Sequence, residues 1–264
     1  MSLLERLDWR GDHFLLNGLT FHLQHQASGA TSDDAFMFYK HRAQLEEFDR
    51  FFRETGFEPR RALELGIWDG GSAAFWTELL DLERYAALDL QSRGDSEYFR
   101  RWADTRPRGT VFTHWGVGQT DSAALMEILK TDQLQPLDLV LDDCSHQYAP
   151  TLTSFELLFP LLRPGGWYVI EDWSWDLQPE FQTVGHPWGV HAPLHPITHE
   201  LITLHGARPD IIRSLRVFRE FIAIERGDFR TSSLQIKSLV PRRPRPWAKI
   251  ATLRAREVWA RLRP

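Results

Sequence analysis

The middle of the chain alternates short apolar runs with amphipathic stretches. The apolar runs typical of buried strands are residues 61–66, 85–90, 109–115, 138–141 and 167–170. The stretches with helical character between them are residues 72–80, 97–103, 121–130 and 151–162. Strands that alternate with helices predict a parallel sheet with right-handed connections, and therefore an α/β fold. Two further apolar runs, 212–218 and 220–226, are closely joined and predict an antiparallel hairpin at one edge of the sheet.

The segments that flank this region have other patterns. Residues 1–30 show no clear period, whereas residues 33–55 have helical spacing and are followed by Gly56, a typical helix stop. Residues 173–196 are rich in Trp, Pro, Gly and His and have no period, as expected of a lid or substrate wall. We therefore predict three parts: an N-terminal cap and helical segment (1–56), a doubly wound Rossmann-like domain with a lid loop at 173–196 (57–230), and a basic C-terminal tail (231–264).

Composition narrows the class of protein. The 264 residues are 42% hydrophobic and 25% charged, which is typical of a globular protein. No apolar run approaches the roughly 20 residues of a membrane span. The single cysteine, Cys144, excludes an intrachain disulfide and indicates a reducing cytoplasm. The net charge of -5 combines +9 over residues 230–264 with -14 over the rest, and an acidic body argues against a nucleic-acid partner.

Two of the predicted strands end in acidic pairs, Asp142-Asp143 and Glu171-Asp172. His146 follows Asp143 by three residues. Because ligands collect at the carboxyl ends of parallel strands, we expect these side chains to share one crevice. Carboxylates that close repel one another unless a cation lies among them. The pattern therefore predicts a metal ion or a cationic ligand, with a base beside it.

A glycine-containing loop, Glu64-Leu65-Gly66-Ile67-Trp68-Asp69-Gly70-Gly71-Ser72, joins the first of these strands to its helix. Glycines allow the backbone to approach a ligand, and the N-terminus of the following helix presents free N–H groups. Trp68 stands at the second glycine position of the dinucleotide fingerprint, so the loop favours a cofactor without phosphates. Asp89, at the end of the next strand, is placed to accept hydrogen bonds from ribose hydroxyls.

Over residues 61–172 these features resemble the class I S-adenosylmethionine-dependent methyltransferases. Glu64-Leu65-Gly66 with Gly70 matches the first motif of that superfamily, and Asp89 matches its ribose-binding acid. Arg163-Pro164-Gly165-Gly166 is similar to its Pro-Gly-Gly turn. Gly-Ile-Trp-Asp-Gly-Gly-Ser, Asp-Asp-Cys-Ser-His and Ile-Glu-Asp more narrowly resemble the metal-dependent O-methyltransferases of macrolide sugars, together with the rhamnosyl O-methyltransferase and cephalosporin hydroxylase group.

The resemblance implies roles for individual residues. Asp143 and Asp172 bind Mg²⁺, and His146 is the base. Cys144 replaces the usual glycine of the family, and Glu171 is a poor third ligand if it points to the opposite face of its strand from Asp172. The residues implied in cofactor binding, some of them by position alone, are Glu64, Gly66, Trp68, Gly70, Ser72, Asp89, Gln119 and Asp142.

The expected activity is the transfer of a methyl group from S-adenosylmethionine to a hydroxyl of a small molecule, such as a glycosylated natural product. A Mg²⁺ ion held by carboxylates lowers the pKa of a hydroxyl, and a neutral histidine can take its proton. Two alternatives stay open. A nicotinamide oxidoreductase is opposed by the missing second glycine, and a non-catalytic methyltransferase-like binding protein is kept open by Cys144. The acceptor, a homo-oligomeric state and the role of the tail are left open by the sequence.

Overall fold

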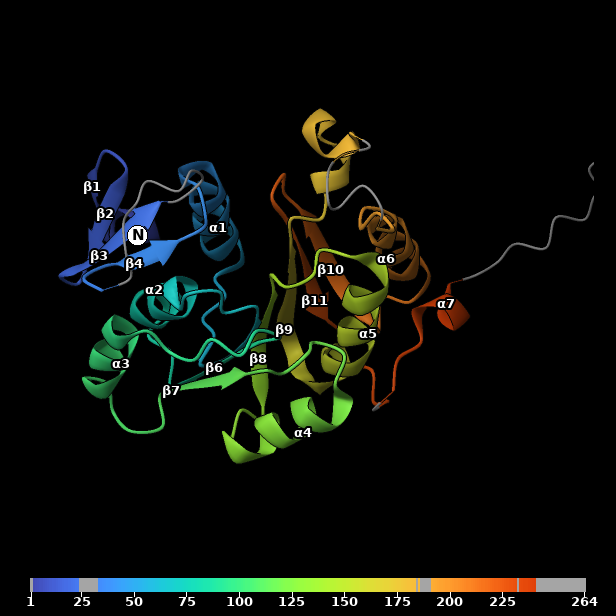
Figure 1. Cartoon of the computed structure of the whole chain (residues 1–264). Coiled ribbons are helices and arrows are strands. Elements are labelled where there is room, and N and C mark those ends of the chain that lie inside the picture. Colours follow the sequence, from blue (N-terminus) through green and yellow to red (C-terminus); the bar gives the residue numbers. More distant parts are fainter. Residues whose placement is uncertain (1, 24–32, 184, 186–190, 232, 241–264) are drawn as a thin grey trace, which may run out of the picture.

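A seven-stranded sheet runs through the centre of the molecule in a computed structural model that describes residues 2–23, 33–183, 185, 191–231 and 233–240 (Figure 1). The strands are β5 (Arg61–Leu65), β6 (Arg84–Asp89), β7 (Val111–Trp115), β8 (Leu137–Asp142), β9 (Leu162–Glu171), β10 (Ile212–Val217) and β11 (Phe221–Arg226). Their order is β10-β11-β9-β8-β5-β6-β7. Strands β5 to β9 pair in parallel, whereas β11 pairs antiparallel with β9 and β10. The predicted fold class and edge hairpin are therefore confirmed.

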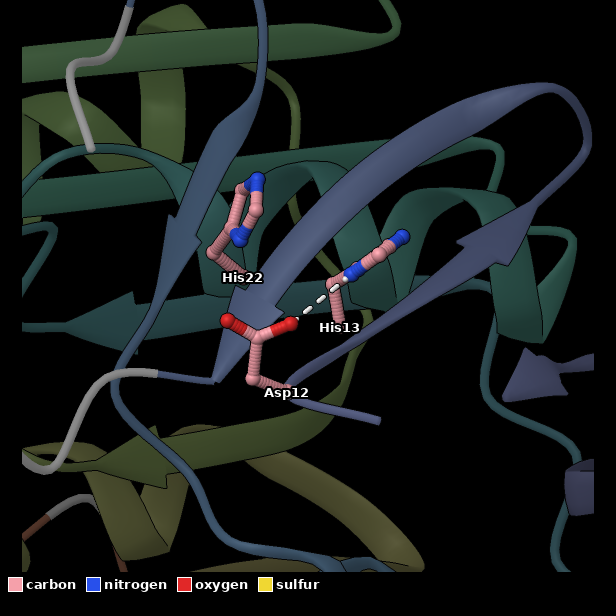
Figure 2. Close-up of side chains that lie close together, drawn as sticks. All are labelled: Asp12, His13 and His22. Atoms are coloured by element: carbon pink, nitrogen blue, oxygen red, sulfur yellow. Dashed lines mark hydrogen bonds and ion pairs between the residues drawn. The ribbon is translucent and has the colours of Figure 1, made fainter. Parts of the chain in front are cut away.

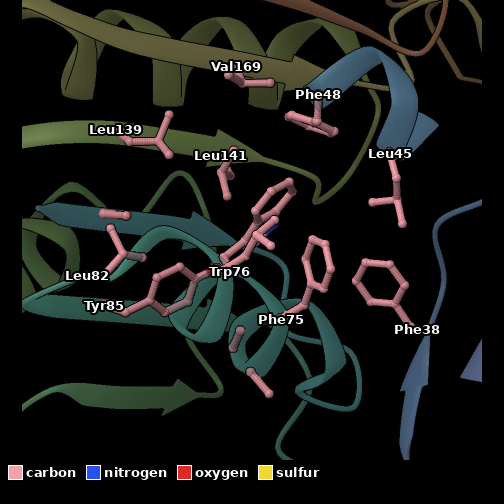
Figure 3. Close-up of a cluster of buried hydrophobic side chains, with 14 of the residues drawn as sticks. Phe38, Leu45, Phe48, Phe75, Trp76, Leu82, Tyr85, Leu139, Leu141 and Val169 are labelled. Carbon is pink, nitrogen blue, oxygen red and sulfur yellow. The ribbon is translucent and has the colours of Figure 1, made fainter. Parts of the chain in front are cut away.

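Helices cover both faces of this sheet, as the alternating pattern predicted. One face packs against α1 (Arg42–Thr55), α2 (Gly71–Leu80) and α3 (Glu97–Asp104), and the other against α4 (Ser122–Thr131), α5 (Tyr148–Leu158) and α6 (Pro196–Ala207). Successive strand residues point to opposite faces, so Leu139 and Leu141 join the first core while Val140 joins the second. Figure 3 shows the first core, in which Phe48 and Trp76 lie close to Leu141. Shorter helical turns are η1 (Leu3–Arg6), η2 (Phe159–Leu161), η3 (Trp175–Leu177), η4 (Pro179–Gln182) and α7 (Ile236–Leu239).

A second, four-stranded sheet lies beside α2 near the N-terminus (Figure 1). Its strands are β1 (Asp8–Arg10), β2 (His13–Leu16), β3 (Leu19–Leu23) and β4 (Phe36–Phe38). Phe14 and Phe21 stack on each other and meet Phe75 of α2 edge to face. Because side chains alternate along a strand, His13 and His22 lie on the other face of this sheet (Figure 2). Residues 2–23, which show no clear period, thus supply three of the four strands of a small sheet that covers the first core.

The predicted helix over residues 33–55 is wrong in its first third. Residues 36–38 form β4, which pairs in parallel with β3, and the helix begins only at Arg42. The imidazole of His41 caps it by accepting a hydrogen bond from the Gln44 amide at 3.1 Å. Pairing with β3 and burial of both Phe36 and Phe38 outweigh the helical spacing, since the three residues of β4 are all buried. The predicted stop at Gly56 is confirmed, with φ +60 and a hydrogen bond to Phe52.

Residues 164–166 were predicted as a turn that precedes the fifth strand. This prediction is wrong, because these residues lie within β9. The register jumps there from Leu137↔Leu162 to Leu139↔Trp167, so the Pro-Gly-Gly segment bulges out of the strand. The described part of residues 173–196 contains only the turns η3 and η4 and the first residue of α6, in agreement with the predicted loop.

The basic residues from 241 onward lie outside the described residues. Within the described residues, no helix has the length and apolar character needed to cross a membrane.

Candidate active site

The acidic pairs end the two neighbouring strands β8 and β9, near the point where the strand order reverses. Asp142 is the last residue of β8 and Glu171 is the last residue of β9, so Asp143 and Asp172 begin the loops that follow. Asp172 and His146 both adopt left-handed backbone conformations, with φ of 52 and 50. Asp and His tolerate this region better than most residues, and such conformations are frequent at functional sites. These sharp turns direct both loops over the end of the sheet.

Asp143, His146 and Asp172 form a compact cluster in this crevice. One ligand atom from each lies within 4.8 Å of the others. The His146 Nε2 atom is 3.8 Å from Asp143 Oδ1 and 3.9 Å from Asp172 Oδ2. The His146 side chain is 12% exposed and that of Asp172 is 42% exposed, so the cluster is open on one side. The structure therefore brings together the three residues to which the resemblance assigns metal binding and catalysis, although the roles themselves stay predictions.

A buried lysine side chain supplies one positive charge beside these carboxylates. Lys40, between β4 and α1, is 2% exposed and its Nζ donates to Asp143 Oδ2 at 2.8 Å. It also donates to Glu171 Oε2, which accepts a second hydrogen bond from the Gln44 Nε2 at 2.6 Å. Glu171 therefore lies in a buried polar network with Lys40 and Gln44, and it is not among the residues whose ligand atoms gather in the cluster. Sequence reasoning missed Lys40 and Gln44, because their segment was predicted as one continuous amphipathic helix.

The charge of Lys40 sets the protonation of its neighbours. Burial alone would raise the pKa of Asp143, but the ammonium of Lys40 and the imidazole of His146 outweigh it and lower that pKa. Burial, reinforced by the charge of Asp143, raises the pKa of Glu171 well above its ordinary range. Partial burial also raises the pKa of Asp172, with His146 opposing the shift. Asp143 is consequently ionised near neutral pH and keeps its Oδ1 directed toward His146.

Asp142 lies on the other side of β8 and takes no part in the cluster. It is 2% exposed and accepts hydrogen bonds from Tyr168 at 2.7 Å and Ser154 at 2.9 Å. The predicted cofactor residue Gln119 completes this network, since its Nε2 donates to Asp142 and its Oε1 accepts from the Ser145 amide. Burial raises the pKa of Asp142 to about 6. The network holds the loop after β8 in place from beneath, and a direct contact of Asp142 or Gln119 with a cofactor stays a prediction.

The loop after β8 is also held from the lid side. Trp175 of η3 is 4% exposed, and its indole N–H donates to the backbone carbonyl of His146 at 2.7 Å. Trp173 donates likewise to the carbonyl of Phe218 at 2.9 Å. The tryptophans at the start of the lid loop therefore anchor it, and one of them fixes the backbone of His146.

Cys144 stays protonated, because burial and then the charge of Asp142 raise the pKa of its thiol, which argues against a nucleophilic role.

Asp89 ties the glycine-containing loop to the end of β6. Its Oδ2 accepts from the amides of Ile67 at 3.1 Å and Trp68 at 2.9 Å, and its Oδ1 accepts from the Gln91 amide at 2.8 Å. Trp68 has φ 54 and a side chain that is well exposed. Gly70 is the N-cap of α2, where a Cβ would strike the ring of Phe99, and Ser72 lies in the first turn. Ribose binding by Asp89 stays a prediction; the structure gives this acid a role in shaping the loop.

Gly66 joins the two halves of the crevice. Its φ is +109, and a Cβ there would lie 2.3 Å from the backbone oxygen of Asp143, far inside van der Waals contact. Gly66→Ala is therefore expected to destabilise the protein by about 2–4 kcal/mol, because it adds backbone strain and pushes the loop after β8 outward. Urea unfolding followed by tryptophan fluorescence measures the change. Gly94→Ala is the control, since it also has a positive φ but an open Cβ position; equal losses in the two variants would contradict the close approach at Gly66.

Glu64 is fully buried within β5. Its Oε2 accepts a hydrogen bond from the Tyr85 hydroxyl at 2.7 Å, and burial raises its pKa to about 7. A carboxyl with a raised pKa in the folded state contributes stability that is lost as pH rises from about 4.5 toward 7. We expect Glu64→Gln to gain up to about 3 kcal/mol relative to the parent between pH 4.5 and 8. Parallel pH profiles of the free energy of unfolding for the two proteins would contradict this assignment.

Comparisons with known proteins identify similar methyltransferases. Residues 63–173 match a family model described as a methyltransferase domain. Demethylmacrocin O-methyltransferase of Streptomyces fradiae is 36% identical over 132 residues, which cover 47% of this chain and 30% of the relative. Mycinamicin VI 2''-O-methyltransferase of Micromonospora griseorubida is 34% identical over 132 residues, with the same 47% and 30% coverage. These matches thus span 30% of the length of the two curated relatives.

Solved structures are also similar over most of the chain. One of them is the MycE methyltransferase from the mycinamycin biosynthetic pathway in complex with Mg, SAH and mycinamycin VI. The TM-score is 0.53 at 28% identity, and the alignment covers 72% of this chain and 51% of that chain.

Proposed function

We propose that this chain, which contains a class I S-adenosylmethionine-dependent methyltransferase domain resembling those of macrolide-sugar O-methyltransferases, methylates a hydroxyl of a glycosylated small molecule. The domain implies S-adenosylmethionine as the methyl donor. The observation that carries the proposal is the cluster of Asp143, His146 and Asp172 beside the glycine-containing loop. An imidazole between two carboxylates, open on one side, can act as the general base that deprotonates a hydroxyl.

The donor set of the cluster fits a divalent cation with hard oxygen ligands. Asp143 and Asp172 would hold Mg²⁺ through their carboxylates, which together with a vicinal diol match its preference for oxygen. Asp143 is ionised and keeps Oδ1 available, since Lys40 occupies only Oδ2. A cation bound there would lower the pKa of an acceptor hydroxyl and orient it. Support for Mg²⁺ comes from the similar MycE structure, which is a complex with Mg.

The residues of the chain then act on the proton and on the geometry of attack. The glycine-containing loop and Asp89 would hold the methyl donor, whose sulfonium supplies an electrophilic methyl group. His146 Nε2 would take the proton of the acceptor hydroxyl as its oxygen attacks the methyl carbon. An oxygen–carbon bond forms, the carbon–sulfur bond breaks, and the electron pair of that bond stays on sulfur. The carbonyl contact from Trp175 would keep His146 oriented throughout.

The segments outside residues 63–173 differ from the shared methyltransferase domain and could determine which acceptor binds. We propose that the lid loop (173–196) and the N-terminal part (1–56) form the acceptor side of the crevice around the Rossmann-like body (57–230). Tyr39 and Trp68 are exposed and meet edge to face with ring centroids 5.2 Å apart, which offers an aromatic surface near the site. Residues 231–264 would form a basic appendage.

The proposal is tested by binding and by activity together. S-adenosylhomocysteine should raise the melting temperature of the protein, because it binds the folded state. NAD should not, because Trp68 replaces the second glycine of the dinucleotide-binding fingerprint. Transfer of a labelled methyl group to glycosylated macrolides should require Mg²⁺, fall at least about 100-fold in EDTA and return when Mg²⁺ is restored. Stabilisation by NAD alone would overturn the methyltransferase assignment. Full activity in EDTA would remove the metal but leave the methyl donor in place.

A further inference from the structure

A second group of potential metal ligands lies on the N-terminal sheet, outside the crevice described above. Asp12, His13 and His22 each offer one ligand atom within 4.8 Å of the others (Figure 2). His13 of β2 and His22 of β3 are cross-strand partners, and their ring centroids are 5.1 Å apart. The His13 Nδ1 and Asp12 Oδ1 atoms are 3.0 Å apart. Two imidazoles and a carboxylate therefore meet on the face of the sheet that points away from the aromatic core.

The surroundings of this group favour a cation. A neutral imidazole binds a metal ion through a ring-nitrogen lone pair, and a carboxylate adds an oxygen ligand of negative charge. The three side chains therefore offer two nitrogen ligands and one oxygen ligand to a single cation. Arg10, the β1 partner of His13, directs its guanidinium to Asp8 at 2.6 Å. The positive charge of Arg10, on the neighbouring strand, is thus already paired with a carboxylate.

The backbone beneath the group is rigid while the side chains have room to adjust. Phe14 follows His13 and Phe21 precedes His22; both are fully buried and stack on each other at 5.1 Å. This packing fixes the register that sets the two histidines opposite each other. Ligand atoms around a tetrahedral ion at about 2.0–2.1 Å lie about 3.3 Å apart. The ligand atoms now lie within 4.8 Å of one another, and the side chains of Asp12 and His13 are 74% and 28% exposed, so side-chain rotation can bring them to that separation.

We propose that Asp12, His13 and His22 bind a late first-row divalent transition-metal ion such as Zn²⁺, Ni²⁺ or Cu²⁺. Imidazole is the ligand that selects these ions, whereas Mg²⁺ prefers oxygen alone. The site is therefore chemically distinct from the oxygen-rich cluster of Asp143 and Asp172. Binding would cross-link β2 and β3, and it would stabilise the small sheet in proportion to metal concentration.

Cu²⁺ is the most informative probe, because its electron paramagnetic resonance spectrum counts nitrogen ligands. The full chain is loaded with one equivalent of Cu²⁺ in excess Mg²⁺, which is intended to occupy the oxygen-rich cluster. We expect superhyperfine splitting from two nitrogens. Zn²⁺ titration by calorimetry in the same buffer should show the corresponding binding event, and Zn²⁺ should raise the melting temperature.

The double variant His13→Gln/His22→Gln should weaken Zn²⁺ binding at least tenfold and remove the two-nitrogen signal. The matched control is His114→Gln, since His114 also pairs with an aspartate and its side chain is 26% exposed, against 28% for His13. This control should bind Zn²⁺ as the parent does. Unchanged affinity in the double variant, or at most one nitrogen in the parent spectrum, would overturn the site. The parent spectrum decides the question even if the double variant fails to fold.

Discussion

Replacement of His146 by Asn is expected to lower methyl transfer by about 10²- to 10⁴-fold, because it removes the imidazole that lies between Asp143 and Asp172. Asn accepts the left-handed backbone conformation, φ 50, that this position requires, so the loop should keep its shape. S-adenosylhomocysteine should bind to the variant within about twofold of the parent, since the glycine-containing loop is untouched. Single-turnover assays together with calorimetry measure the two quantities separately.

The control for this variant is a histidine remote from the crevice. His114→Gln removes an imidazole from β7 that pairs with Asp132 at 2.6 Å, and it should leave turnover unchanged. A His146→Asn protein with parental turnover on an identified acceptor would remove the base assignment. A variant that loses both turnover and cofactor affinity would instead indicate that His146 shapes the cofactor loop.

Replacement of Lys40 by Met should destabilise the protein by about 3–5 kcal/mol at neutral pH. The substitution leaves Asp143 and Glu171 close together without the ammonium that now lies 2.8 Å from Asp143. Without that ammonium the pKa of each carboxyl should rise, so the loss should shrink as pH falls and the carboxyls become protonated. Urea unfolding between pH 5 and 8 measures the dependence. Activity should fall as well, because Asp143 would no longer be held ionised.

Two further variants separate charge from packing at this position. Lys40→Met/Glu171→Gln removes one of the two crowded carboxyl groups and should recover part of the lost stability, whereas a purely steric defect would persist. Lys130→Met changes an exposed lysine and should alter the free energy of unfolding by no more than about 0.5 kcal/mol. A loss below about 1 kcal/mol for Lys40→Met would show that the buried ion pair contributes little.

Lys40 gives the N-terminal part a direct connection to the candidate active site. The segment between β4 and α1 delivers the lysine, and β4 itself is held by its pairing with β3. Changes in the N-terminal sheet can therefore reach Asp143 through one side chain.

The parallel sheet and the position of its functional end were predictable from sequence because each depends on local pattern. Continuous apolar runs such as Leu139-Val140-Leu141 form strands wherever helices cover both faces of a sheet. Acids that directly follow such runs lie at the carboxyl end of the sheet. The proximity of Asp143 and Asp172 can therefore be predicted once the strand order of this fold class is known. The helix over residues 33–55 was predicted too long for the converse reason, since Phe36 and Phe38 form a strand only because β3 lies beside them.

The sequence by itself determined which residues could meet at the end of the sheet: two acidic pairs, one histidine and a glycine-containing loop. The family resemblance already implied that Asp143 and Asp172 form the metal-binding pair, but only the tertiary structure shows which partners hold the other two carboxylates. Asp142 and Glu171, the last residues of their strands, point into buried networks with Tyr168 and Lys40. Asp143 and Asp172, one residue further on, turn toward His146. The physical reason is that a buried charge persists only beside a partner, and the partner Lys40 lies 103 residues away in sequence from Asp143.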